Sequence, residues 1–131
     1  MEYDFRSGDP LFAFDSELRI VSWNAAAEEL TGIRADEAVG RRCWEVVCGT
    51  DERGSLVCHT GCSDARLAAK GWPVSSKRLS IKTANGRRDV TVMTIAVRNG
   101  QPVFLHVLRN GLERLTEEDE PPPRALTPRQ L

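Results

Sequence analysis

The sequence predicts an α+β domain in which helices separate two groups of β-strands. The first group is a hairpin of two apolar runs with a polar corner between them, and the second is a run of three strands. An Asn-Gly pair, which is typical of tight hairpin turns, lies between successive strands of the second group. We therefore expect a hairpin, then short helices, then an antiparallel meander; the expected strands are residues 11–14, 19–23, 76–83, 89–97 and 102–108.

Three short helices are expected between the two groups of strands. Asn24 is a good N-cap for an alanine- and glutamate-rich stretch, and Gly32 would end that helix. Asp36 is the expected cap of a second, shorter helical turn. The expected helices are residues 25–30, 33–39 and 65–70.

The composition is that of one globular domain followed by a tail. The chain has 131 residues, of which 40% are apolar and 28% charged, and its formal net charge is −1. This charge offers no general attraction for nucleic acid, and no apolar stretch reaches the roughly 20 residues that span a bilayer. The first residues lack the layout of a signal peptide, so we expect a cytoplasmic protein without membrane contact. The sequence shows no phosphate-binding loop or H-E-x-x-H motif, so an enzyme is not expected.

All four cysteines of the chain fall in one short segment. Cys43, Cys48, Cys58 and Cys62 have the spacing C-x4-C-x9-C-x3-C, and thiols this close in sequence commonly meet in space. Three interpretations stay open. The thiolates could hold zinc or an iron–sulfur cluster, a disulfide could form reversibly between Cys58 and Cys62 or between Cys43 and Cys48, or the cysteines could be structural. Cytoplasmic thiols are mostly reduced, which favours metal binding or redox sensing over permanent disulfides.

Cys58 and Cys62 are the pair expected to act together. Gly61 lets the backbone turn sharply between them, so their sulfurs should be bonded or within about 4 Å of each other, as in a tetrahedral metal site. Cys43 and Cys48 have apolar neighbours and are expected to be buried. Substitution of Cys58 or Cys62 by serine should therefore remove any metal or redox response and leave the fold intact.

The order of elements and several short motifs resemble the PAS family of sensor domains. The resemblance covers about residues 10–109 and implies a five-stranded antiparallel sheet in the order 2-1-5-4-3, with short helices on one face. It also implies a small pocket between helices and sheet that serves ligands, cofactors or signalling, and frequent dimerisation. The matching stretches are Pro10 to Asp15, Arg19 to Glu28 with its Trp23-Asn24 pair, Leu30-Thr31-Gly32, Val39-Gly40-Arg41 and the turn at Asn85-Gly86.

Flavin is not expected as a cofactor. Residues 40–45 resemble the motif around the photoreactive cysteine of light-oxygen-voltage domains, and Cys43 occupies the position of that cysteine. However, Arg42 and Trp44 replace an asparagine and an arginine of the motif, and Cys48 lies near the position of its glutamine. The asparagines that would bind the flavin ring are not visible in the strand at 89–97.

Haem is not expected either. An axial ligand is needed, and the histidine best placed to serve, His59, lies in a loop beside Cys58. His106 alternates with Leu105 and Val107 along a strand, on the face that carries Phe104. A histidine in that position is expected to be hydrogen-bonded or exposed rather than to bind a metal.

The end of the chain resembles the start of another domain. Residues 126–131 resemble the opening of LuxR-type helix-turn-helix domains, with Gln130 where glutamate is common, and three prolines before them would form a stiff spacer. The implied parent is a transcriptional regulator that binds DNA through a C-terminal domain. The expected division is a lead-in (1–9), a PAS-like sensor domain (10–109), a linker (110–125) and the start of a truncated LuxR-type helix-turn-helix domain (126–131).

The two resemblances thus imply a sensor that detects a small ligand or a redox or metal state and signals to DNA through another domain. The expected site is the set of four cysteines, and a short charged helix at 112–120 favours a homodimer. The alternative is a ligand-free PAS module for protein interaction and dimerisation, in which the cysteines are structural.

Overall fold

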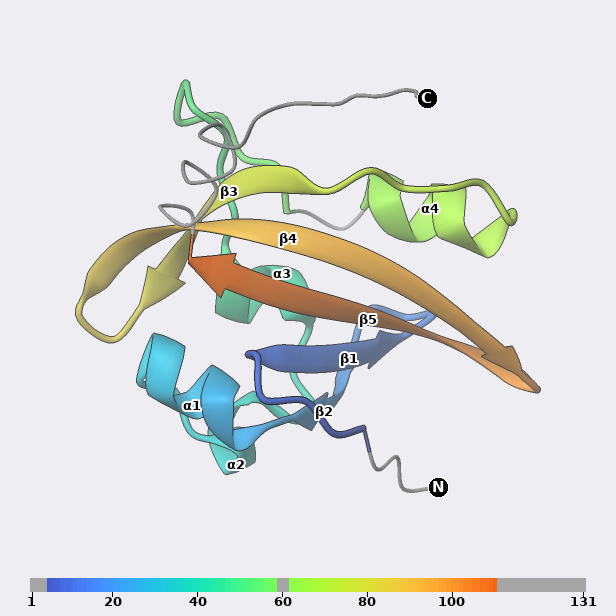
Figure 1. Cartoon of the computed structure of the whole chain (residues 1–131), viewed down its shortest axis with the longest axis horizontal. Helices are drawn as coiled ribbons and strands as arrows, with labels where there is room; N and C mark the ends of the chain where they lie inside the picture. Colours follow the sequence, from blue (N-terminus) through green and yellow to red (C-terminus); the bar gives the residue numbers. More distant parts are fainter. Residues whose placement is uncertain (1–4, 59–61, 111–131) are drawn as a thin grey trace, which may run out of the picture.

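The structure, a computed structural model, describes residues 5–58 and 62–110 (Figure 1). The predicted helix at 112–120, the LuxR-like motif and His59 lie outside the described residues. The elements follow in the order β1 (Leu11–Asp15), β2 (Ile20–Trp23), α1 (Ala25–Thr31), α2 (Ala35–Ala38), α3 (Cys43–Val47), α4 (Ser63–Ala69), β3 (Lys77–Thr83), β4 (Gly86–Asn99) and β5 (Gln101–Asn110).

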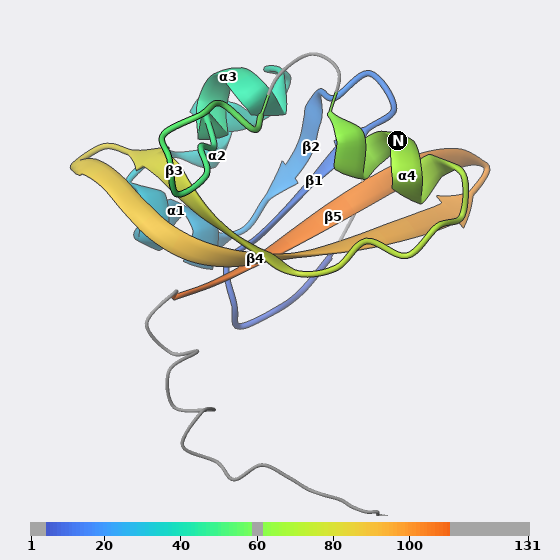
Figure 2. The same ribbon diagram turned by 90° about the horizontal axis from the view of Figure 1, so that it is seen from above.

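The strands form one antiparallel sheet in the order β2-β1-β5-β4-β3. The first hairpin, β1 and β2, joins the meander because β1 also pairs with β5. The helices lie on one side of this sheet (Figure 2). The α+β class, the five-stranded antiparallel sheet and the strand order that the PAS resemblance implied are therefore confirmed.

Both turns of the meander are at the predicted Asn-Gly pairs. Thr83 pairs with Gly86 across the first turn, and Gly86 has a φ of 113°. Gly100, with a φ of 86°, separates β4 from β5. Glycine adopts positive φ without the steric cost of a Cβ, so each pair fixes both the position and the tightness of its turn. Strand pairing continues up to both turns, which makes β4 and β5 longer than predicted.

Helix α1 has the ends that the sequence predicted. Asn24 is its N-cap, and the Asn24 Oδ1 atom accepts hydrogen bonds from the amides of Ala27 (2.8 Å) and Leu11 (3.0 Å). Gly32 ends the helix in the left-handed conformation, with a φ of 73°, and its amide donates to the Glu28 carbonyl. One asparagine side chain therefore caps α1 and also fastens it to the start of β1.

The predicted cap of α2 was wrong. Arg34, not Asp36, is the N-cap residue, and the Glu37 carboxylate accepts the Arg34 amide at 3.1 Å. The Glu28 carboxylate, which belongs to α1, accepts the Ala35 amide at 2.7 Å. A carboxylate from another helix thus accepts an amide at the start of α2, a role that was predicted for Asp36. Such a contact is not visible in the local sequence.

Helix α3, at the start of the cysteine segment, was not predicted. The Cys43 amide donates to the Leu18 carbonyl at 2.7 Å, which fixes the start of α3 against the β1–β2 corner. Beyond α3, Thr50 and Ser80 of β3 exchange two backbone hydrogen bonds of 2.9 Å each. The cysteine segment is therefore attached to the edge of the sheet at β3.

Both faces of the sheet are apolar. The inner face, under the helices, carries fully buried aromatic and branched side chains, namely Phe12, Phe14, Phe104, Ile20, Ile81 and Leu108. The outer face carries a second buried group, Leu11, Ala13, Val103, Leu105 and Val107, with Phe5 packed against it. In the part of the chain that the structure describes, no helix is both long and apolar enough to cross a bilayer.

Candidate functional site

A narrow cavity lies on the inner face of the sheet, next to α3. Three cysteines line it, together with His106 of β5, the indole of Trp44 and the ring of Phe12. Its volume is about 20 Å³, which is room for about one water molecule. We call it the thiol cavity, after Cys43, Cys58 and Cys62. It is the one place in the described residues where most of the predicted site comes together.

The fourth cysteine stays outside this cavity. Cys48 ends α3 in the left-handed conformation, with a φ of 47°, and its thiol donates to the Glu45 carbonyl at 3.2 Å. Cys43 is buried as predicted, whereas Cys48 is only partly buried. The structure therefore groups three of the four predicted site cysteines and separates Cys48 from them.

Each cavity cysteine is positioned by a different element. Cys43 opens α3, and Cys62 is the N-cap residue of α4. Cys58 follows the loop that is attached to β3, and its amide donates to the Gly49 carbonyl at 3.1 Å. The three thiols thus reach one cavity from the start of α3, from the loop attached to β3 and from the start of α4.

The environment of the cavity favours neutral thiols. Burial raises the pKa of the Cys43 thiol well above its usual range, and the nearby Cys58 and Cys62 add to this effect. Burial likewise raises the pKa of Cys58, to about 11, against a hydrogen bond from the Gly49 backbone that lowers it. At neutral pH these two groups are therefore thiols rather than thiolates, and thiols are weak nucleophiles.

His106 places a neutral imidazole at the same cavity. Burial lowers the pKa of His106 to about 4, while Asp64 raises it and Lys77 lowers it. The Nδ1 atom lies 3.1 Å from the Thr94 hydroxyl. His106 was expected to be hydrogen-bonded or exposed, and the first of these holds. Its place beside the thiols was missed, although its alternation with Leu105 and Val107 was a usable signal.

A charged pair lies near the imidazole. Asp64 of α4 and Lys77 of β3 form a salt bridge of 2.6 Å, and Asp64 is buried. The Nε1 N–H of the Trp44 indole is buried and has no hydrogen-bond partner among the described residues. Buried donors are usually paired, so a cavity lined by Trp44 suits an occupant that can accept a hydrogen bond.

The interpretation of the cysteines as a metal or disulfide site stays a prediction. All four thiols are free, so Cys58 and Cys62 are not bonded to each other. As the side chains of the described residues stand, no three from histidine, cysteine, aspartate and glutamate form a group that could hold a metal ion.

The five-stranded antiparallel sheet agrees with a family comparison. Residues 5–105 match the family model described as the PAS fold. The chain belongs to the PAS family. The PAS domain of an HTR-like protein from Haloarcula marismortui, 20% identical, aligns with a TM-score of 0.59 over 79% of this chain and 87% of that one. The PAS domain of the Cronobacter turicensis quorum-sensing receptor RpfR, in complex with BDSF, is 13% identical, with a TM-score of 0.60 over 82% of this chain and 98% of that one.

One curated relative is a much longer protein. Phytochrome A of Zea mays is 34% identical over 80 residues, which cover 61% of this chain. The match spans only 6% of the length of phytochrome A. Both solved structures are below 25% identity and show the fold alone. What this PAS domain senses must therefore be argued from its own residues.

Proposed function

We propose that this PAS domain is the sensory part of a cytoplasmic transcriptional regulator rather than an enzyme, and that the thiol cavity receives its signal. The observation that carries the proposal is the meeting of Cys43, Cys58, Cys62 and His106 at one cavity between helices and sheet. Small-molecule binding sites are typically apolar cavities with a few converging polar groups. The LuxR-like residues 126–131 support an output through DNA.

The chemistry of the cavity suits a small ligand, a soft cation or an oxidant. A cation such as Zn²⁺ would displace the thiol protons and offset the cost of burying thiolates. A peroxide would join two of the thiols as a disulfide, taking up their two protons and two electrons as it is reduced to two waters or to water and an alcohol. A small neutral ligand with an acceptor atom could pair with the Trp44 indole. The solved RpfR domain, with BDSF bound, supports the ligand form of the proposal.

Protein purified without oxygen distinguishes these signals. We would measure its metal content and absorbance spectrum, then titrate free thiols before and after exposure to hydrogen peroxide. A metal centre predicts bound zinc or iron in fixed ratio to the chain, and a thiol switch predicts the loss of two thiols per chain. A ligand would appear as a small molecule released on denaturation and identified by mass spectrometry.

Serine substitutions locate the response. Cys58→Ser and Cys62→Ser should abolish it without changing the circular dichroism of the folded chain. Cys48→Ser is the matched control, because Cys48 lies outside the cavity. If no metal, thiol loss or ligand is found, the proposed sensing role at the thiol cavity is wrong.

A second function is favoured by the small volume of the cavity and by the outer face of the sheet. A cavity of about 20 Å³ excludes all but the smallest ligands. On the outer face, Met93 and Ile95 of β4 are 39% and 42% exposed, beside the outer apolar group. The alternative is therefore a ligand-free module that dimerises and whose cysteines are structural. Light scattering at high micromolar concentration should then report a dimer that does not respond to metal or peroxide.

A further inference from the structure

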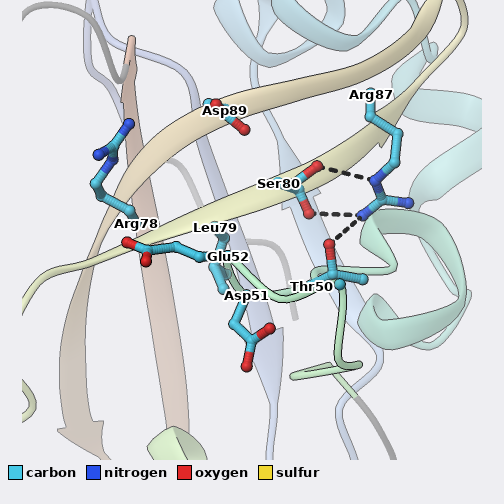
Figure 3. A pocket seen from close by; sticks show the side chains of 9 residues that line it. Thr50, Asp51, Glu52, Arg78, Leu79, Ser80, Arg87 and Asp89 are labelled. Carbon is cyan, nitrogen blue, oxygen red and sulfur yellow. Dashed lines mark hydrogen bonds between the residues drawn. The ribbon is translucent and has the colours of Figure 1, made fainter.

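Arg87 of β4 joins the cysteine segment to the sheet. Its Nε atom donates to the Ser80 hydroxyl at 2.9 Å, and its Nη2 atom donates to the Ser80 carbonyl at 2.6 Å. The same Nη2 atom also reaches the Cys48 carbonyl and, at 3.4 Å, the Thr50 hydroxyl. Figure 3 shows the Arg87 guanidinium beside Ser80 and Thr50, with dashed lines to both. One guanidinium thus holds β3 and residues 48–50 together.

The residue between those two contacts is packed directly against a cavity thiol. A Cβ atom placed on Gly49 would lie 2.7 Å from the Cys58 sulfur and 3.2 Å from the Leu79 Cδ1 atom. The Gly49 carbonyl also accepts the amides of Val57 (2.8 Å) and Cys58 (3.1 Å). With packing this close, the Cys58 sulfur and the Gly49 backbone cannot be displaced independently.

The contacts therefore form one continuous series. The Cys58 sulfur touches Gly49, the neighbours of Gly49 bond to Arg87, and Arg87 belongs to β4. Thr50 adds two backbone bonds to Ser80. Arg87 lies in the part of β4 that pairs with β3, opposite Lys82. Residues 90–99 of β4 continue from there and pair with β5.

We propose that Arg87 is a positioning residue that fixes the geometry of the thiol cavity and couples the state of Cys58 to the central sheet. This inference rests on the proposed function, because it takes the thiol cavity as the place where the signal is received. Arg87 touches no cavity thiol itself and acts through residues 48–50. A bond, ligand or ion at the Cys58 sulfur would displace Gly49, and the displacement would reach β4 through the guanidinium.

Arginine suits this role better than lysine does. Its planar fork presents several donors in fixed directions, whereas a lysine ammonium is a single flexible charge. Arg87→Lys should keep the positive charge but only some of the hydrogen bonds that Arg87 donates. Arg78 provides a matched control, because it is an exposed arginine of β3 that extends away from Ser80 and Thr50 (Figure 3).

The first experiment measures alkylation of each cysteine. The chain would be treated with N-ethylmaleimide under reducing, oxygen-free conditions, and the rate at each cysteine read by peptide mass spectrometry. We expect Arg87→Gln to raise the rate at Cys58 about tenfold, Arg87→Lys to raise it less, and Arg78→Gln to leave it unchanged. Cys43 should change least, because its contact with Leu18 does not depend on Arg87. Equal acceleration at all four cysteines would show general destabilisation and would overturn the proposal.

The second experiment tests the reverse direction. A coupling between two sites is reciprocal, so alkylation of Cys58 should accelerate hydrogen exchange at the amides of Thr50 and Ser80, about tenfold in the wild-type chain. In Arg87→Gln these amides should exchange quickly already, and alkylation should add little. Unchanged exchange in the wild-type chain would contradict the coupling. Both results concern contacts within the chain, so they can succeed even if the metal, thiol and ligand assays show that the cavity senses nothing.

Discussion

Helix α1 and the cysteine segment both lie on the inner face of the sheet, but they are held in different ways. The ends of α1 are fixed by residues next to it in sequence, Asn24 at the start and Gly32 at the end. The cysteine segment is fixed by distant residues, namely Leu18, Ser80 and Arg87. Local caps fix where α1 starts and ends, while its packing against the sheet supplies most of its stability. A segment held by long-range contacts changes when those contacts change.

The largest expected effect tests whether α1 and the cysteine segment unfold together. Phe12 is 1% exposed. The centroid of its ring lies 5.2 Å from that of Trp23, just before α1, and 5.3 Å from that of His106 at the cavity. Phe12→Ala should lower the free energy of unfolding by about 3–5 kcal/mol, since it removes a large core side chain. The urea unfolding transition should shift by the same amount whether it is monitored by tryptophan fluorescence or by the alkylation of Cys58. Different shifts would show that the regions are independent.

A second effect is the pH dependence of the free energy of unfolding, and it arises at the thiol cavity rather than at α1. His106 has an ordinary pKa of 6.5 and, in the folded chain, a pKa lowered to about 4 by burial. The unfolded chain therefore takes up a proton first, so the free energy of unfolding should fall as pH decreases from 6.5 to 4 and this contribution should level off below that. The loss is at most about 3 kcal/mol. The measurement is urea unfolding across this range, with His106→Gln expected to flatten the dependence. Identical curves for both proteins would exclude His106 as the cause.

The contact between Gly49 and Cys58 gives a smaller effect. Gly49→Ala places a methyl group 2.7 Å from the Cys58 sulfur, and overpacking of this kind costs about 1–3 kcal/mol. Removing the sulfur in the double variant Gly49→Ala/Cys58→Ala should recover much of that loss. A double-mutant cycle in urea measures the coupling. Additive effects of the two substitutions would mean that the Cys58 sulfur is not packed on Gly49 as described.

The smallest expected effect is at the cap of α1. Asn24→Ala removes the Oδ1 atom that accepts the amides of Ala27 and Leu11, and loss of such a cap costs about 1 kcal/mol. Asn24→Asp keeps the acceptor and should retain most of the stability. Because α1 is held locally, the alkylation rate of Cys58 should be unchanged in both variants. A faster rate at Cys58 would remove the distinction between the two regions.

Much of the fold could be predicted from local patterns. The hairpin, the meander and its turns follow from strand-forming runs and from Asn-Gly pairs, which act over a few residues. The ends of α1 follow from Asn24 and Gly32 for the same reason. The strand order came from the resemblance of ordered motifs to the PAS family, and the structure confirms it.

The sequence by itself thus determined the elements whose hydrogen bonds are local, and the clustering of cysteines in one segment. Only the tertiary structure decided which side chains share the cavity. It brought His106 from β5 to Cys43, Cys58 and Cys62, and it left Cys48 at the end of α3, bonded to Glu45. It also capped α2 with a carboxylate from α1 and placed Arg87 across the cysteine segment. The physical reason is the same in each case: these contacts join residues far apart in the chain, and no local pattern encodes which distant side chain will be near.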